Sequence, residues 1–292
     1  MVLESFIRQL LSGLSLGMVT FITAAGLSIV LGTLKILNLA HGSLFMIGAF
    51  LCYWLTSMLG DMPGAFWVAL VIGPVLAAVV GGLMETLLLR RIYGWHVMYQ
   101  WILTFGLLLL VGDLIKLIWG VEYYMVSPPW PFNGPVEVLG VYFPAYNLLV
   151  IALGPLIFLG LWALLRYTKL GRIIRAATQN PEMVNALGVN VPFTYTCVFM
   201  LGSWLAGLGG TLIAPMTAVS LGMDTSVIID CFIVVVIGGL GSTFGAFLGA
   251  IIFGLSYAFG ILIFPKLAIG IGFIIMATIL VVKPWGLMGT PE

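Results

Sequence analysis

The sequence predicts an all-α protein that crosses a membrane many times. Of its 292 residues, 62% are hydrophobic and only 7% are charged, and the mean hydropathy of +1.22 lies far outside the range of soluble domains. Apolar runs long enough for a helix to cross a bilayer follow one another along the chain. Polar or glycine-rich interruptions near residues 38–43 and 238–242 fall within this apolar sequence, so we expect a helical bundle with broken or re-entrant segments there.

Nine apolar runs are the expected spans. At about 20 residues per span, the chain holds about eight or nine transmembrane helices in one domain over residues 1–292, with no room for a separate soluble domain. Two of the runs are short or interrupted. The runs cover residues 9–33, 41–59, 64–89, 98–118, 146–166, 191–213, 226–240, 243–264 and 267–283.

The charged residues between the runs predict sidedness, because basic loops stay in the cytoplasm. Counting spans from the basic loops places segment 119–145 outside, the N-terminus outside and the C-terminus inside, unless 41–59 or 226–240 is re-entrant. The residues expected in cytoplasmic loops are Arg90, Arg91, Arg166, Lys169, Arg172 and Arg175. Those expected in outer loops are Asp61, Glu122, Glu137 and Asp224.

The first interruption brings polar side chains to membrane depth. It contains Asn38, His41, Gly42 and Ser43, and irregular backbone is tolerated in a bilayer only where protein or a wet cavity covers it. We therefore predict that these four residues line a substrate pathway. The alternative is that the polar groups cap the following helix and that His41 only fills space in the bundle.

The second interruption is rich in glycine. Gly238, Gly239, Gly241 and Ser242 can unwind a helix and expose N–H groups at the start of the next one, where a carboxylate is attracted. The run that begins at Gly241 faintly repeats the one that begins at Gly42, and paired broken helices point to a transport site between two halves. A simple re-entrant turn explains the same glycines.

Three acidic residues lie within apolar runs. Ionisable groups at membrane depth are functional candidates, and Asp230, which precedes the second interruption, is the first of them and is added to the predicted pathway. Asp113 and Glu85 rank lower, because each can lie near a span boundary or pair with a neighbour, as Asp113 can with Lys116.

A short cytoplasmic helix is predicted between two runs, over about 180–188. Asn180 suits the N-cap, Pro181 the first turn, Glu182 the positive end and Gly188 the C-terminus. The spacing of Met183, Ala186 and Leu187 gives one small apolar face. We predict that this face docks on a separate ATPase and couples it to the bundle; the alternative is that the face packs under the bundle.

Nothing in the sequence predicts chemistry by this chain alone. No P-loop is present, so any ATP hydrolysis must come from a partner, and no His-Glu-x-x-His zinc spacing occurs. The chain has three cysteines, and their spacing matches no disulfide or metal-binding motif. All three lie in apolar sequence, which is typical of small buried residues: Cys52, Cys197 and Cys231. The net charge of +1 gives no sign of a nucleic-acid partner.

Four blocks together resemble the branched-chain amino-acid permease family of bacterial ABC importers. They cover residues 38–50, 179–190, 236–249 and 283–289 and follow one another across nearly the whole chain. The Asn-x-Ala-His-Gly run that begins at Asn38 is similar to the shorter of the two permease types. Members often carry an acidic residue after His-Gly, where this chain has Ser43.

The resemblance implies a multi-pass permease of the bacterial inner membrane that moves branched-chain or other small amino acids. It further implies a second related permease, two cytoplasmic ATPase subunits that bind ATP and magnesium, and an extracytoplasmic substrate-binding protein that supplies most of the selectivity. No cofactor or metal is expected on this chain itself. Relatives of the family also import urea, short amides and aromatic acids.

Two other classes of function stay open at this point. A secondary transporter driven by an ion gradient would explain the broken helices and the embedded Asp230. A gated channel or a purely structural membrane subunit is the third possibility, and the sequence shows no repeated carbonyl filter that would favour a channel.

Overall fold

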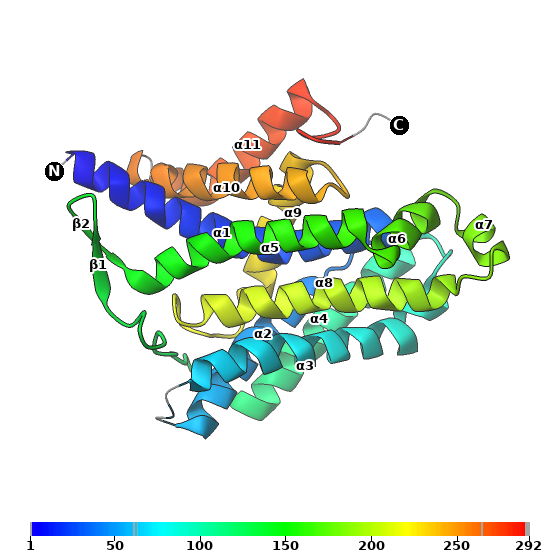
Figure 1. Ribbon diagram of the computed structural model, residues 1–292, viewed down its shortest axis with the longest axis horizontal. Helices are drawn as coiled ribbons and strands as arrows, with labels where there is room; N and C mark the ends of the chain where they lie inside the picture. The colour runs from blue at the N-terminus through cyan, green and yellow to red at the C-terminus, as the bar shows by residue number, and fades with distance from the viewer. Residues whose placement is uncertain (1, 61, 63, 264, 290–292) are drawn as a thin grey trace.

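The computed structural model describes residues 2–60, 62, 64–263 and 265–289. Most of this chain is helical, and the order of elements follows the order of the apolar runs (Figure 1). The helices are α1 (Val2–Leu34), α2 (His41–Leu59), α3 (Ala65–Leu87), η1 (Leu89–Ile92), α4 (Val97–Trp119), α5 (Ala145–Tyr167), α6 (Lys169–Gln179), α7 (Pro181–Ala186), α8 (Val191–Ile213), α9 (Met223–Gly238), α10 (Thr243–Ile263), η2 (Pro265–Leu267) and α11 (Ala268–Val282), and the strands are β1 (Pro135–Val138) and β2 (Val141–Pro144).

The prediction of an all-α membrane bundle is confirmed. Each of the nine apolar runs forms a helix, and among the described residues seven helices are long and apolar enough to cross a membrane. The other two, α9 and α11, have 16 and 15 residues, which is shorter than the roughly 20 residues of a full span. The two breaks are present as well, between α1 and α2 and between α9 and α10. Asp61 lies outside the described residues.

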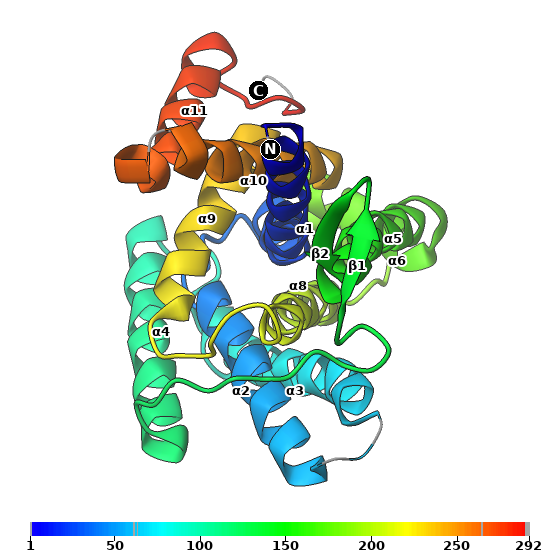
Figure 2. The same ribbon diagram turned by 90° about the vertical axis from the view of Figure 1, so that its left-hand side faces the viewer.

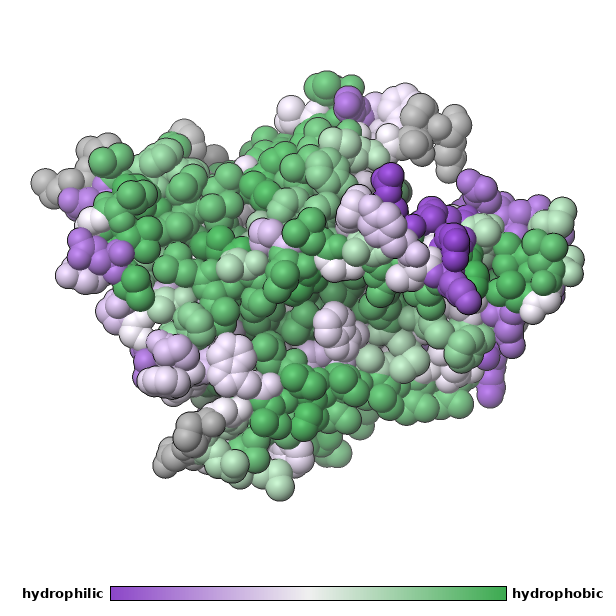
Figure 3. All heavy atoms as spheres, in the orientation of Figure 1, coloured by the Kyte–Doolittle hydropathy of each residue, from purple (hydrophilic) through white to green (hydrophobic). Residues whose placement is uncertain are grey.

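The bundle has two central helices and a hydrophobic outer surface. Figure 2 shows α1 and α8 between the pair α2 and α3 on one side and α10 with α5 on the other. Most of α1 and α8 is buried, whereas only a small part of α4 and of α5 is buried. The face seen in Figure 3 is correspondingly hydrophobic over most of its area. Such a surface is stable in hydrocarbon and would be a liability in water.

Glycine sets how closely the helices approach. A Cβ atom on Gly210 would lie 1.9 Å from the Phe45 carbonyl oxygen of α2, and one on Gly254 would lie 2.3 Å from the Gly13 carbonyl oxygen of α1. Small residues therefore bring backbones into contact where water cannot drive association. Gly13 and Gly17 fit a Gly-x-Ser-x-Gly pattern, but the pattern lies inside α1 and packs on α10, so it lacks the strand–turn–helix context of a nucleophile.

The two ends of the bundle differ. The segment between α4 and α5 lies at one end together with the N-terminus (Figure 1). It contains the β1–β2 hairpin, for which the apolar runs gave no prediction. Its two-residue turn uses positive φ at Leu139 and Gly140, as hairpin turns of this length require. The basic helix α6 and the short α7 lie at the opposite end. The hairpin and α6 thus lie at opposite ends of the bundle, while which end faces the cytoplasm stays a prediction.

Candidate functional site

The first break leads the chain back into the bundle. After α1 ends at Leu34, residues 35–40 are irregular and α2 begins at His41. The His41 Nε2 atom lies 2.9 Å from the carbonyl oxygen of Thr23. Thr23 is three turns before the end of α1, roughly 16 Å along its axis at 1.5 Å per residue. The start of α2 therefore lies deep inside the protein.

The polar groups of this break are buried and incompletely paired. Asn38, His41 and Ser43 are each at most 1% exposed. Among the described residues, both side-chain polar atoms of Asn38, the Nδ1 of His41 and the Oγ of Ser43 have no hydrogen-bond partner. Buried polar atoms are usually satisfied, because leaving one unpaired costs about 1–3 kcal/mol. Simple helix capping does not explain these residues, since α2 has no side-chain cap.

A second helix begins beside the first break. A Cβ atom on Gly42 would lie 2.2 Å from the carbonyl oxygen of Asp224, in the first turn of α9. The chain reaches this point from the end of α8 through residues 214–222, where Val219 and Tyr124 exchange two backbone hydrogen bonds of 2.8 and 2.9 Å. The starts of α2 and α9 thus meet inside the bundle, where helix N-termini place partial positive charge.

Asp224 corrects the sequence-based assignment of charges. It was expected in an outer loop, yet it is 4% exposed and begins the short helix α9. Its Oδ1 accepts a hydrogen bond of 2.9 Å from the Thr225 backbone N–H. The reason for the error is that 214–222 turns back into the protein, which hydropathy does not reveal. Pro215 and Gly222, which has φ +87°, were the local signals of that turn.

The glycine-rich break lies elsewhere. Gly241 packs on Gly32, near the end of α1, whereas His41 at the start of α2 contacts Thr23, and these two points of α1 are roughly 13 Å apart at 1.5 Å per residue. Gly238 and Gly239 are buried against α10 and the closing segment 285–289, and Ser242 Oγ accepts the Gly245 N–H at 3.0 Å. Within segment 238–242, Gly238 and Gly239 are buried, whereas Leu240 is 62% exposed, and a role of this segment in the substrate pathway stays a prediction.

The three embedded acids have different surroundings. Asp230 is partly buried within α9, and Asp113 is exposed on α4. Glu85 is fully buried and bound by Arg90, Tyr93 and Thr196, so its predicted pairing with a neighbour is found. Thr196, on α8, could not be identified as a partner from local sequence.

The predicted cytoplasmic helix forms as α7. The Asn180 Oδ1 atom accepts the Met183 N–H at 2.9 Å, Pro181 occupies the first turn, and Gly188 has φ +84°. The apolar side chains on its free face are Met183 and Leu187, 59% and 76% exposed, with Ala186 exposed between them.

A different side chain holds α7 against the protein. Val184, 7% exposed, packs with Ala177 and Val191. The face predicted to dock is therefore not packed under the bundle. Figure 3 shows an apolar patch over α7 next to the hydrophilic residues of that end.

Comparison with known proteins identifies the family. The family described as "Branched-chain amino acid transport system / permease component" matches residues 9–282. The chain belongs to this permease family. The permease is 27% identical to the high-affinity branched-chain amino acid transport system permease protein BraD of Pseudomonas aeruginosa, over 98% of this chain and 97% of that protein.

Other relatives agree with this assignment. The permease is 26% identical to LivH of Escherichia coli over 98% of this chain and 96% of that protein. It is 25% identical to a probable branched-chain amino acid transport permease LivH of Methanocaldococcus jannaschii, over 91% and 87% of the two chains. The family and the seven apolar spans make it a multi-pass inner-membrane protein, as predicted.

A solved structure supports the fold. PsaBC from Streptococcus pneumoniae in complex with Fab superposes with a TM-score of 0.51 and 15% identity, over 97% of the permease and 95% of that chain. At this identity the similarity extends to the arrangement of helices only.

Proposed function

We propose that the permease is a membrane subunit of an ATP-driven importer for branched-chain amino acids or chemically similar small solutes. The observation that carries this proposal is α7, a capped helix whose apolar side chains Met183 and Leu187 are exposed at the basic end of the bundle. An exposed apolar helix face outside the span is costly unless a partner covers it.

The proposed complex contains the partners that the family resemblance implied. A second, related permease would complete the pathway, and two ATPase subunits bearing ATP and magnesium would dock on α7 and its counterpart. An extracytoplasmic binding protein would deliver the solute to the end that carries the β1–β2 hairpin. The family and the relatives' names support branched-chain amino acids as the first substrates to test.

The proposed pathway passes the junction of α2 and α9. Its polar lining comes from Asn38, His41 and Ser43, whose unpaired buried atoms can bind a passing solute or water. Two helix N-termini favour a carboxylate there, while the buried carboxylate of Asp224 favours an ammonium group. A zwitterionic amino acid carries both groups.

The test compares two substitutions on α7. Ala186→Arg puts a charge into the apolar face, whereas Asn185→Arg puts the same charge on an exposed neighbour outside it. We expect Ala186→Arg to abolish both uptake and co-purification of the ATPase without changing solute affinity of the binding protein, and Asn185→Arg to preserve uptake. Normal uptake by Ala186→Arg would exclude docking at this face.

An ion-gradient transporter is the second candidate, and one observation favours it. Asp230 is partly buried on α9, which is too short for a full span, as expected of an ion-coupling carboxylate. Under this alternative the purified permease alone would transport solute into vesicles, and both Asp230→Asn and collapse of the gradient would stop it. Dependence on a co-purifying ATPase would exclude it.

A further inference from the structure

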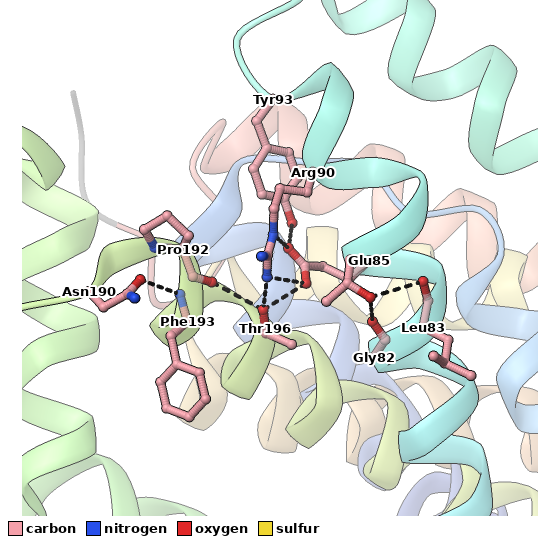
Figure 4. A network of polar contacts seen from close by, with 10 residues as sticks. Gly82, Leu83, Glu85, Arg90, Tyr93, Asn190, Pro192, Phe193 and Thr196 are labelled. Carbon is pink, nitrogen blue, oxygen red and sulfur yellow. Dashed lines mark hydrogen bonds and ion pairs between the residues drawn. The ribbon is translucent and has the colours of Figure 1, made fainter.

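A buried carboxylate joins two helices at the end of the bundle that carries α7. Glu85, in the last turns of α3, is fully buried. Arg90 approaches it with Nε 3.2 Å from Oε1 and Nη2 3.1 Å from Oε2. The Tyr93 hydroxyl donates to Oε1 at 2.9 Å and the Thr196 hydroxyl donates to Oε2 at 2.7 Å. Figure 4 shows the four side chains converging, with Thr196 reaching across from α8.

The arms of this Glu85 cluster depend on one another. A hydroxyl has one proton, so when Thr196 donates to Glu85 its oxygen is free to accept from Arg90, which contacts it. Burial, with the negative charge of Glu85, raises the pKa of the Tyr93 phenol well above its usual range, so Tyr93 remains a donor. Each of these side chains is one arm of the cluster. Loss of any arm leaves the buried charge of Glu85 less compensated, which costs free energy, so the side chains hold one another in place.

The α8 arm lies next to the predicted ATPase contact. α7 ends at Ala186 and α8 begins at Val191, with Asn190 as its N-cap. Thr196 is in the second turn of α8. Nine residues therefore separate Ala186, at the end of α7, from Thr196, and one hydrogen bond of 2.7 Å joins Thr196 to Glu85.

The Tyr93 arm ends at a cavity. The rings of Tyr93 and Tyr195 meet edge to face with centroids 6.1 Å apart, and both line a cavity of about 180 Å³. Leu34 and Ile36, at the start of the first break, line the same cavity, as does Gln100. Gln100 is 6% exposed, and its Oε1 has no partner among the described residues. The cavity is therefore polar in part and adjoins the segment that leads to His41.

We propose that the Glu85 cluster is the link through which movement of α7 opens and closes the Tyr93–Tyr195 pair at the inner mouth of the pathway. Glu85 and Thr196 are positioning residues in this scheme, and the two tyrosines form the gate. The proposal rests on the proposed function, because it needs an ATPase that moves α7. A purely structural role would leave the cluster important for folding but without effect on the gate.

The test measures access to the cavity directly. Ile36 is 2% exposed and lines the cavity, so Ile36→Cys, in a background without Cys52, Cys197 and Cys231, reports gate opening through its rate of reaction with a water-soluble maleimide. The rate is measured in the purified complex with its ATPase, without nucleotide and with ATP plus vanadate. We expect the two rates to differ when the cluster is intact.

Two threonine substitutions then separate the effect of the Thr196–Glu85 hydrogen bond from the effect of losing any threonine hydroxyl nearby. Thr196→Val removes the α8 arm and nearly keeps the side-chain volume. Thr86→Val is the control, because within the described chain its hydroxyl bonds only to the Gly82 and Leu83 carbonyl oxygens of its own helix. We expect Thr196→Val to abolish the nucleotide-dependent difference and to lower coupled uptake by roughly tenfold, the factor that one hydrogen bond to a charged group can carry. Thr86→Val should preserve both.

The outcomes are distinguishable. If Thr196→Val keeps the full nucleotide-dependent difference, the link is wrong, even where the variant is less stable. If the intact cluster gives equal rates in both nucleotide states while the ATPase is bound, the gate is wrong and the proposed function stands. If no ATPase co-purifies with the intact chain, the proposed function and this inference fail together.

Discussion

Substitution of Gly239 by alanine should detach the closing segment of the chain. Gly239 has φ +103°, and a Cβ atom on it would lie 2.5 Å from the Gly289 nitrogen and 3.0 Å from the Trp285 carbonyl oxygen. Alanine at positive φ costs about 1–2 kcal/mol. The new methyl must also displace segment 285–289, which donates Leu287 N–H to the Ile237 carbonyl oxygen and Met288 N–H to the Gly238 carbonyl oxygen, both at 2.9 Å.

The expected loss can be worked out from these contacts. Two backbone hydrogen bonds contribute about 0.5–1.5 kcal/mol each, so Gly239→Ala should destabilise the protein by roughly 2–5 kcal/mol in total. Gly140→Ala is the matched control. Gly140 has φ +81°, and among the described residues no atom lies within 4 Å of the position that its Cβ atom would take, so only the conformational cost of about 1–2 kcal/mol applies.

Thermal unfolding in detergent and limited proteolysis of the C-terminal segment measure this difference. We expect Gly239→Ala to unfold at a lower temperature than Gly140→Ala and to lose residues 285–289 to protease first. If the two variants are equally stable and equally resistant, and Gly239→Ala nevertheless abolishes uptake, then the packing argument is refuted and Gly239 belongs to the substrate pathway after all.

Two further predictions concern the coupling helix and the first break. Asn180→Ala removes the cap bond to the Met183 N–H and should weaken α7 by about 1 kcal/mol. Uptake by this variant should fall several-fold at unchanged protein levels, while Asn180→Asp preserves uptake. Equal uptake by both variants would show that the cap is unimportant. Ser43→Ala removes a buried hydroxyl without a partner among the described residues, so the unfolding temperature should stay the same or rise while uptake falls. Unchanged uptake would remove Ser43 from the proposed pathway.

The junction of α2 and α9 is where the proposed substrate pathway crosses the bundle. Both helices begin inside the bundle after irregular segments, 35–40 and 214–222, and the residues nearest the junction, such as Asn38, Ala40 and Val219, are buried, as irregular backbone in a low-dielectric environment requires. Tyr124 pairs with Val219 over one of them. Movement of either segment would expose backbone groups at an energetic cost, so under the proposed function an opening at the junction needs the energy that the partners supply.

Local sequence determined which parts of the chain became helices and where they end. Apolar runs alone predicted the nine helices of the bundle, because a bilayer leaves a backbone few other ways to satisfy its hydrogen bonds. The cap of α7 was also readable, since Asn180, Pro181 and Gly188 act on neighbouring residues. The break before His41 was visible for the same reason.

Only the tertiary structure decided which of these segments meet. The contact of Gly42 with Asp224 joins residues far apart in sequence, and it depends on glycine-lined helix crossings that hydropathy does not specify. The partner of Glu85 on α8 is likewise Thr196, 111 residues away, although Arg90 and Tyr93 are close in sequence. Sequence periodicity records which face of a helix is apolar, whereas the identity of the helix that covers it follows from packing of the whole bundle.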